Sequence, residues 1–220
     1  MVLAGSGYAR VMEIAIIGTG NVGGALARAC VAAGHSVVLS ARHPEHAQKV
    51  AGEIGARAAD STRAAVGGAD LVVLAVPATA TAPVVESVAG DLAGKVVVDP
   101  TNPMNLSPEE LLRAAGPVTD ALRVLAPEAR FVKPFNTVFA SNLTDPVVDG
   151  VPLDGYYAGD DGPAKDTVAA LLADLGFRPL DTGPLAAARI LELMASLNIT
   201  LNANHGWPWR SGWKLIGPTG

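Results

Sequence analysis

One short run, Gly18-Thr19-Gly20-Asn21-Val22-Gly23, matches the pattern G-x-G-x-x-G and determines the architecture expected for the chain. It follows an isoleucine-rich run at 13–17 and precedes small residues at 21–33 that predict a helix. In such a strand–turn–helix unit the first glycine allows the tight turn and the second lets the backbone approach a pyrophosphate. The third lets the helix pack on the strand, and the amides of its first turn face the phosphates. The run therefore predicts a dinucleotide-binding site.

Outward from this run, predicted strands and helices alternate. Apolar runs predict further strands at 36–39, 57–59, 70–76, 95–98, 130–133, 155–159 and 177–180. Helices are expected at 44–54, after Ser61, after Ser107, at 163–175 and at 185–204. This alternation predicts an α/β fold of the Rossmann type, a doubly wound, mostly parallel sheet with a short C-terminal helical extension. A broad buried face is predicted on the last helix from its apolar residues, Ile190, Leu191, Leu193, Met194, Leu197 and Leu201.

Composition excludes several classes of protein. The 220 residues are 50% hydrophobic and carry a formal charge of −5, so neither nucleic acid nor an anionic membrane is an expected partner. The single cysteine, Cys30, cannot form an internal disulfide, and no Cys or His residues have the spacing of a metal site. No run resembles a secretory signal or a membrane span, so a soluble, cytoplasmic protein is expected.

The end of the second strand discriminates between the two nicotinamide dinucleotides. An NAD site usually has Asp or Glu there to accept from the ribose hydroxyl, but residues 14–44 contain no acid. The chain instead has Ser40-Ala41-Arg42-His43. An arginine can pair with a 2′-phosphate and stack on the adenine, and a serine can donate to the same phosphate. This favours NADP(H) over NAD(H).

Several runs resemble one family along nearly the whole chain. They are 16–23, Ser40-Ala41-Arg42, Ala75-Val76-Pro77, Lys133-Pro134-Phe135-Asn136-Thr137, 158–161 and 178–185. They resemble the NADPH-dependent reductases of the deazaflavin coenzyme F420, and the soluble oxidoreductase domain of the six-transmembrane metalloreductases, which pair NADPH with a flavin. The resemblance implies a Rossmann domain, usually dimeric, that moves hydride directly between two bound cofactors. The run 133–136 is more similar to the metalloreductase domain, so deazaflavin, ordinary flavin (FAD or FMN) and other acceptors all stay open.

The same resemblance implies a set of cofactor contacts. Residues 19–22 would hold the pyrophosphate, Arg42 and Ser40 the 2′-phosphate with His46 near it, and Val76 and Pro77 the ribose and nicotinamide. Asn136, Thr137 and Ala140 would border the nicotinamide and its acceptor. The full set of expected cofactor-binding residues is Gly18, Thr19, Gly20, Asn21, Val22, Gly23, Ser40, Ala41, Arg42, His46, Val76, Pro77, Asn136, Thr137 and Ala140.

No residue is expected to act as a catalytic acid or base when the acceptor is itself a redox cofactor, because positioning and electrostatics then suffice. Tyr156 and Tyr157 lack a lysine four residues later, so the Tyr-x-x-x-Lys pair of carbonyl reductases is missing. Lys133 is the one candidate acid for an alternative ketone or imine reduction. The other interpretation is that it only keeps the end of a strand in contact with solvent. Asp99 and Asn102 follow the fifth strand, where such sheets bind ligands, although a turn-forming role is equally plausible.

Three functions therefore remain: transfer of hydride between NADPH and a deazaflavin or flavin, reduction of a small ketone or imine, and non-catalytic NADP(H) sensing. The chain is divided into an extension at 1–11, disordered or mis-started, an NADP-binding domain at 12–183 and a C-terminal segment at 184–220. That segment holds all three tryptophans, between Trp207 and Trp213. It is expected to complete the active site or a homodimer interface, with the indoles near the rim of the second-cofactor pocket.

Overall fold

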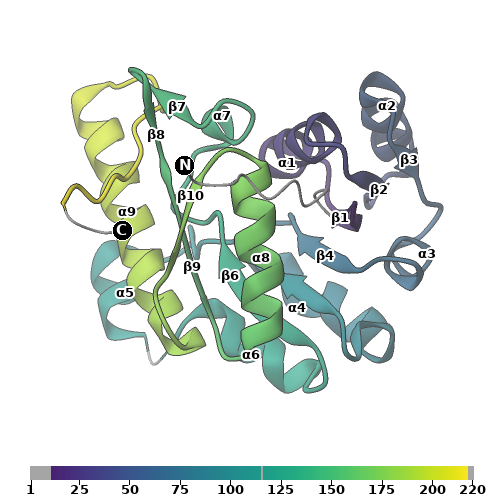
Figure 1. Ribbon diagram of the computed structural model, residues 1–220. Helices are drawn as coiled ribbons and strands as arrows, with labels where there is room; N and C mark the ends of the chain where they lie inside the picture. The colour runs from purple at the N-terminus through teal and green to yellow at the C-terminus, as the bar shows by residue number, and fades with distance from the viewer. Residues whose placement is uncertain (1–10, 115, 218–220) are drawn as a thin grey trace, which may run out of the picture.

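In the part of the chain that the computed structural model describes, residues 11–114 and 116–217, eight strands form one sheet (Figure 1). Their order is β10-β9-β6-β5-β4-β1-β2-β3. The strands are β1 (Glu13–Ile17), β2 (Ser36–Ser40), β3 (Arg57–Ala58), β4 (Leu71–Leu74), β5 (Val96–Val98), β6 (Arg130–Pro134), β9 (Asp154–Gly159) and β10 (Arg178–Asp181).

The strands from β3 to β6 pair in parallel. β9 pairs antiparallel with β6, and β10 pairs parallel with β9. All four residues of β4 are buried, because helices cover both faces of this part of the sheet. The order in which strands are added reverses between β1 and β4: β2 and β3 lie on one side of β1, and β4, β5 and β6 lie on the other, which places a topological switch point there. The predicted mostly parallel, doubly wound sheet is confirmed.

Helices pack on both faces of the sheet. Figure 1 shows α8 crossing in front of the strands, with α9 near one edge and α2 near the other. One buried cluster joins the sheet to α1 (Asn21–Ala32), α2 (Pro44–Ile54) and α8 (Gly162–Asp174). The other cluster joins it to α3 (Thr62–Gly67), α4 (Ala78–Val88), α6 (Val118–Leu125) and α9 (Ala188–His205). The shorter elements are η1 (Ala89–Leu92), α5 (Pro108–Arg113), α7 (Ala140–Leu143), β7 (Val147–Val148), β8 (Val151–Pro152) and η2 (Leu185–Ala187).

Local sequence signals explain where several helices begin. Ser107 caps α5: its Oγ accepts from Glu110 N at 3.2 Å, and Glu110 Oε2 accepts from Ser107 N at 2.7 Å. Ser61 and Asp161 cap α3 and α8 through their side-chain oxygens. The predicted helices after Ser61 and Ser107 are confirmed.

Some elements have no counterpart in the sequence prediction. The helices α4, α6 and α7 and the hairpin of β7 and β8 were not predicted. Residues Thr79, Thr81 and Pro83 disfavour a helix locally, yet α4 forms because Val85 and Val88 are buried against the sheet. The strand expected at 70–76 is shorter, Leu71–Leu74, since the chain turns into the region around Val76 and Pro77 before α4.

The prediction of a broad buried apolar face on α9 is wrong. Ile190 is 61% exposed and Leu197 is 50% exposed. The helix lies near the sheet edge, so only a narrow stripe contacts the body, and half of that stripe is polar. The buried residues of α9 are Ala188, Leu191, Glu192, Ala195, Asn198 and Asn202.

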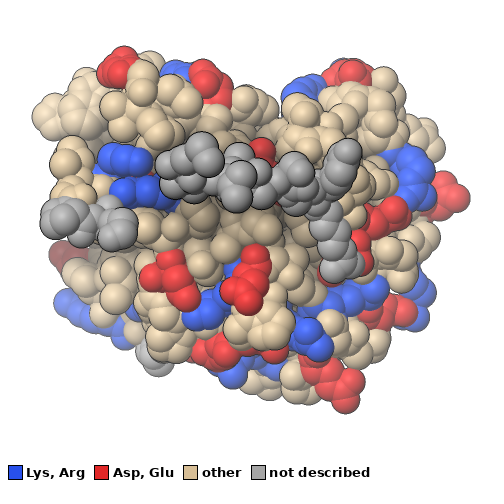
Figure 2. All heavy atoms as spheres, viewed as in Figure 1, with Lys and Arg blue, Asp and Glu red and all other residues tan. Residues whose placement is uncertain are grey.

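Three further observations concern the surface charge, the length of the helices and the N-terminal extension. On the face that Figure 2 shows, basic and acidic side chains are interspersed, without a field of one sign. Among the described residues, no helix combines the length and apolar character needed to cross a membrane. The predicted N-terminal extension lies outside the described residues except for Val11, which is exposed.

Candidate cofactor and acceptor site

A cleft of about 620 Å³ lies at the carboxyl ends of the parallel strands. It is lined by the turn after β1, by residues 75–79 after β4, by 100–102, 104 and 105 after β5, and by 136–140 after β6. Three residues of α9 complete its wall: Ala195, Asn198 and Ile199. This is the position at which open α/β sheets bind their ligands.

The glycine turn has the geometry that its sequence predicts. Gly18 has a φ of 106°, and a Cβ there would lie 2.3 Å from the Ala75 carbonyl oxygen. A Cβ at Gly23 would lie 2.0 Å from the Gly18 oxygen, so neither position accepts a side chain. A Cβ at Gly20 would meet no protein atom within 4 Å, although Gly20 lines the cleft. The space over Gly20 is therefore open to a ligand, and α1 begins there with no side chain capping its amides.

Of the three residues predicted to lie at the 2′-phosphate, two are exposed and one is buried. Arg42 is exposed and has neither an ion pair nor a hydrogen bond to any described residue. His46 is also exposed, with its ring centroid 5.5 Å from that of His43. Ser40, by contrast, is 1% exposed, and its Oγ lies 3.3 Å from Thr62 Oγ1. The structure thus presents Arg42 and His46 at the start of α2 but buries the Ser40 hydroxyl.

The cleft brings together all five residues expected to border the nicotinamide. Val76, Pro77, Asn136, Thr137 and Ala140 line the cleft together with the glycine turn. Asn136 and Thr137 are each 4% exposed, yet Asn136 Oδ1 and Thr137 Oγ1 have no hydrogen-bond partner among the described residues. An acceptor and a hydroxyl, both unpaired and both beside the cleft, match the needs of a carboxamide, which has one NH₂ and one C=O.

Sequence reasoning missed part of the cleft. Thr101, Met104 and Asn105 line it from the loop after β5, and Asn198 lines it from α9. The only sequence signal for this wall was Asn102, placed after the fifth strand. The segment at 184–220 is expected to complete the active site or a homodimer interface, but no residue of α9 is singled out for the cleft, since its pattern predicts apolar burial instead.

A fully buried charge cluster lies behind the cleft. Lys133 Nζ is 3.2 Å from Asp99 Oδ2 and 3.1 Å from Glu192 Oε1, and all three side chains are 0% exposed. Burial alone would raise the pKa of Asp99. The Lys133 ammonium and the hydrogen bonds from Thr101 and Thr119 outweigh that effect and hold the pKa below its usual value.

Lys133 therefore has neither of its predicted roles. It does not line the cleft, so it cannot reach a ketone or imine there. It is also fully buried, so it does not expose the end of its strand to solvent. Its ammonium is held by two carboxylates and by the Thr101 carbonyl oxygen, at 2.8 Å. Among the described residues that line the cleft, none has a titratable side chain. No group of His, Cys, Asp or Glu residues in the described chain could hold a metal ion.

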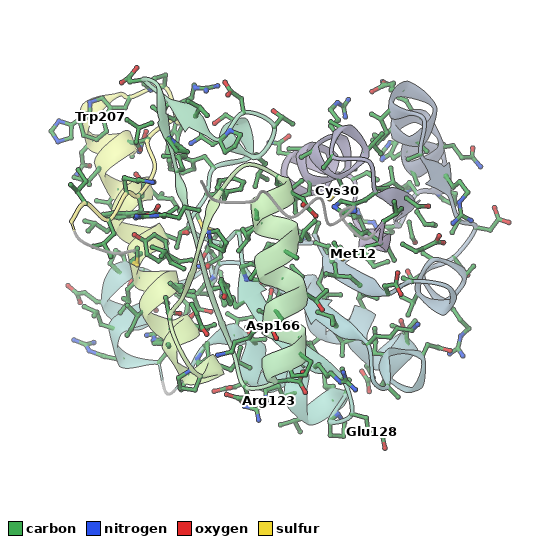
Figure 3. The ribbon with its side chains drawn as sticks, in the orientation of Figure 1. Met12, Cys30, Arg123, Glu128, Asp166 and Trp207 are labelled. Carbon is green, nitrogen blue, oxygen red and sulfur yellow. The ribbon has the colours of Figure 1, made fainter. Side chains whose placement is uncertain are left out.

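The tryptophans lie behind or outside the cleft wall rather than in it. Trp209 packs edge-on against Phe139, with ring centroids 5.4 Å apart, and Phe139 lines the cleft. Trp207 stacks on His205 at the outer end of α9, where Figure 3 shows it directed away from the body. None of the three tryptophans lines the cleft.

The C-terminal segment is nevertheless firmly attached. Ser141 Oγ donates to the Trp209 carbonyl oxygen at 2.5 Å, and Asn142 Nδ2 donates to those of Arg210 and Ser211. Further along, the buried carboxylate of Asp154 accepts from Leu215 N at 2.6 Å. The segment thus ties α7, α9 and β9 together behind the Phe139 wall.

Comparison with known proteins shows which family the chain resembles. The profile of the family described as "NADP oxidoreductase coenzyme F420-dependent" matches residues 13–103. The F420-dependent NADP reductase of Methanothermobacter thermautotrophicus is 32% identical over 212 residues, which cover 89% of this chain and 91% of that protein. The metalloreductase STEAP3 of Rattus norvegicus is 32% identical over 185 residues, but the match covers 82% of this chain and only 36% of STEAP3.

Solved structures show the same likeness. A protein from Arthrobacter sp. FB24, provisionally named an F420-dependent NADP reductase, superimposes with a TM-score of 0.81 and 29% identity, covering 94% of this chain and 100% of that one. An imine reductase from Streptomyces aurantiacus has a TM-score of 0.65 at 22% identity over 86% of this chain and 61% of its own, which shows a shared fold alone. From the identity and coverage of its relatives, the chain belongs to the F420-dependent NADP reductases, a family of NADP-dependent oxidoreductases.

Proposed function

We propose that the protein transfers a hydride between NADP(H) and a flat redox acceptor, a deazaflavin such as coenzyme F420 or a flavin. The observation that carries this proposal is the chemistry of the cleft lining. No described residue that lines the cleft can exchange a proton near neutral pH, whereas several amides and apolar surfaces can orient flat rings. When bound, NADPH supplies the hydride, and the protein then needs only to hold the two rings in contact and to exclude water.

The residues present fit NADP(H) at three points. The open space over Gly20 and the uncapped start of α1 would receive the pyrophosphate. Arg42, which has no partner among the described residues, would pair with the 2′-phosphate, and His46 would lie beside it. The unpaired Asn136 Oδ1 and Thr137 Oγ1 would fix the carboxamide of the nicotinamide. The Ser40 hydroxyl is buried beside Thr62 Oγ1, so the expected donation from Ser40 to the 2′-phosphate is not part of this proposal.

The acceptor would occupy the other half of the cleft. Pro100, Thr101 and Asn102 line the cleft after β5, and Ala195, Asn198 and Ile199 line it from α9. The acceptor would lie between these two walls. Reduction of a ketone or imine is the weaker alternative, because hydride addition leaves a strongly basic oxygen or nitrogen that needs a proton donor, whereas a reduced flavin or deazaflavin can leave as its delocalised anion. Lys133, the lysine that the sequence offers as the proton donor, is buried behind the wall.

The proposal also includes a homodimer, with the C-terminal segment at 184–220 forming part of the interface between its subunits. Ile190 and Leu197 lie seven residues apart on α9, so both face the same side of the helix, and both are largely exposed. Trp207 extends the apolar surface at the end of that helix. Exposed apolar surface of this kind is typical of an interface between subunits. We expect a dimer in light scattering and a monomer after Ile190 and Leu197 are both changed to Glu.

The proposed function is tested by offering acceptors separately to the protein and NADPH. Stopped-flow absorbance at the NADPH band is followed with a deazaflavin, FAD, FMN, a ferric chelate and a cyclic imine. Oxidation by the deazaflavin or a flavin, and not by the imine, is the expected result. Oxidation by the imine alone would replace the proposal with imine reduction. Tight NADPH binding without oxidation by any acceptor would instead favour a sensor.

A further inference from the structure

Behind the cleft, the buried ammonium group of Lys133 joins three segments of the chain that contribute to the cleft walls. Lys133 comes from β6, Asp99 from the end of β5 and Glu192 from α9. The Lys133 Nζ atom contacts both carboxylates, at 3.2 and 3.1 Å, and donates to Thr101 O at 2.8 Å. The cluster therefore joins segments that are separated by more than thirty positions in the sequence but border one cavity.

The first link runs from Asp99 to the loop after β5. Asp99 Oδ1 accepts from Thr101 N at 3.0 Å and from Thr101 Oγ1 at 2.6 Å, while Lys133 binds the carbonyl oxygen of the same residue. Thr101 is thereby fixed at both ends of its backbone. The next residue, Asn102, donates to Asn136 O at 2.7 Å. The position of the Thr101–Asn102 wall thus depends on the charge pair behind it.

The second link runs from Glu192 to α9. Glu192 Oε1 accepts from Val118 N at 3.0 Å and forms an ion pair with Lys133 Nζ at 3.1 Å, and Arg189 Nη1 lies 3.5 Å from Glu192 Oε2. Ala195 and Ile199 lie three and seven residues later on the same helix face and line the cleft. Fixing Glu192 therefore fixes the rotation of α9 about its axis at the cleft.

The cluster acts on the cleft only through these walls. Neither Lys133 nor Asp99 lines the cleft, and Glu192 borders only a side chamber of about 140 Å³. Two carboxylates and two cations, Lys133 and Arg189, balance one another inside the protein, so loss of one charge leaves another buried without its partner. The cofactor end has a separate support, since Gly18 N donates to Ser40 O on β2.

We propose that Lys133, Asp99 and Glu192 are positioning residues that set the spacing between the loop after β5 and α9, and hence the fit of the acceptor. The proposal rests on the proposed function, because it assigns the acceptor to these two walls. NADP(H) binding at the glycine turn and at Arg42 is independent of the cluster.

The test uses Glu192→Gln, which keeps the shape and an acceptor for Val118 N but removes the charge. We expect the acceptor KM to rise about tenfold, the equivalent of one hydrogen bond to a charged group, while the Kd of 2′-phospho-ADP-ribose, which lacks the nicotinamide, changes less than about twofold. Hydrogen exchange should become faster at 100–105 and at 195–199 without ligand, and stay unchanged at 18–24. Thr119→Val, which removes the 2.6 Å hydrogen bond to Asp99 Oδ2 without a change of charge, should show the same pattern more weakly.

Glu53→Gln is the matched control. It breaks an ion pair between Arg28 and Glu53, whose side chains are both 44% exposed, and should alter neither the KM nor the exchange at the two walls. The proposal is overturned if the Kd of 2′-phospho-ADP-ribose rises in step with the acceptor KM, or if exchange accelerates over the whole sheet. An unchanged acceptor KM in both Glu192→Gln and Thr119→Val overturns it as well. If no acceptor reacts with the unmodified protein, the proposed function fails, and the exchange measurements alone decide whether the cluster fixes the walls.

Discussion

Asn102 and Asn136, which both line the cleft, bind each other. Asn136 Nδ2 donates to Asn102 Oδ1 at 3.0 Å, and Asn102 Nδ2 donates to the Asn136 carbonyl oxygen at 2.7 Å. This pairing fixes the Asn136 amide with its Oδ1 unpaired, buried and beside the cleft. A buried acceptor held in one orientation is suited to receive an N–H from a ligand.

Asn136→Ala should therefore weaken NADPH binding. We expect the Kd to rise about tenfold, which corresponds to the loss of roughly one hydrogen bond made to a buried acceptor. Fluorescence titration gives the Kd, and 2′-phospho-ADP-ribose, which lacks the nicotinamide, is the control ligand. Its affinity should not change. An equal loss for both ligands would mean that Asn136 supports the fold and not the nicotinamide.

Arg42→Ala should weaken NADPH binding by about 1.5–3 kcal/mol, the range for hydrogen bonds to charged groups, with little effect on NADH. Arg42 is available for this role because it has no ion pair or hydrogen bond among the described residues. Titrations with both dinucleotides at one ionic strength measure the effect. Arg113→Ala on α5 is the control, since that side chain is 80% exposed and remote in sequence from the dinucleotide motifs. Equal losses for NADPH and NADH would contradict the assignment of Arg42 to the 2′-phosphate.

The glycine turn could be predicted from sequence because its requirements are local. The positive φ of Gly18 and the contact at Gly23 exclude a side chain whatever the rest of the chain does. The wall formed by α9 could not be predicted in this way. Glu192 and Asn198 can be buried only because Lys133 and Ser211, distant in sequence, satisfy them. The burial of Lys133 escaped prediction for the same reason, since a lone lysine at a strand end is usually solvated.

Trp209→Ala should raise the acceptor KM more than the KM of NADPH. Trp209 supports Phe139 edge-on, and removing the indole lets that ring leave the cleft wall. Steady-state kinetics with each substrate varied in turn measure the two KM values. Trp207→Ala is the matched control, because Trp207 stacks on His205 at the far end of α9 and contacts no residue of that wall that the structure records. Equal effects of the two substitutions would argue against a support role for Trp209.

Cys30 should not react with a thiol reagent while the protein is folded. It is 1% exposed in α1, and burial raises the pKa of its thiol to about 12, so the reactive thiolate is scarce at pH 8. Ellman's reagent should modify no thiol in the native protein and one per chain in guanidinium chloride. Because α1 begins at the expected pyrophosphate site, NADP⁺ should slow the residual reaction further. Rapid labelling of the native protein, with or without NADP⁺, would show that α1 opens easily.

Asp154 should stabilise the fold above about pH 4 and lose that effect as the pH falls towards 2. Burial would raise the pKa of Asp154, but hydrogen bonds from Arg178, from Leu215 N and from Lys214 lower it from 3.8 to about 2. A carboxyl whose pKa is lower in the folded than in the unfolded state binds protons preferentially when unfolded. Its contribution is therefore present above the unfolded value and lost on acidification through the folded one.

Urea unfolding of the unmodified protein and of Asp154→Asn, each from pH 6 to pH 2, measures this contribution as a difference. The difference in the free energy of unfolding should be constant above about pH 5 and shrink between pH 4 and pH 2. Other carboxyls titrate in both proteins and cancel in the difference. Because Asp154 holds Lys214 and Leu215, the emission of Trp213 should change over the same interval in the unmodified protein only. A difference that stays constant down to pH 2 would mean that Asp154 is not the carboxylate that anchors the C-terminal segment.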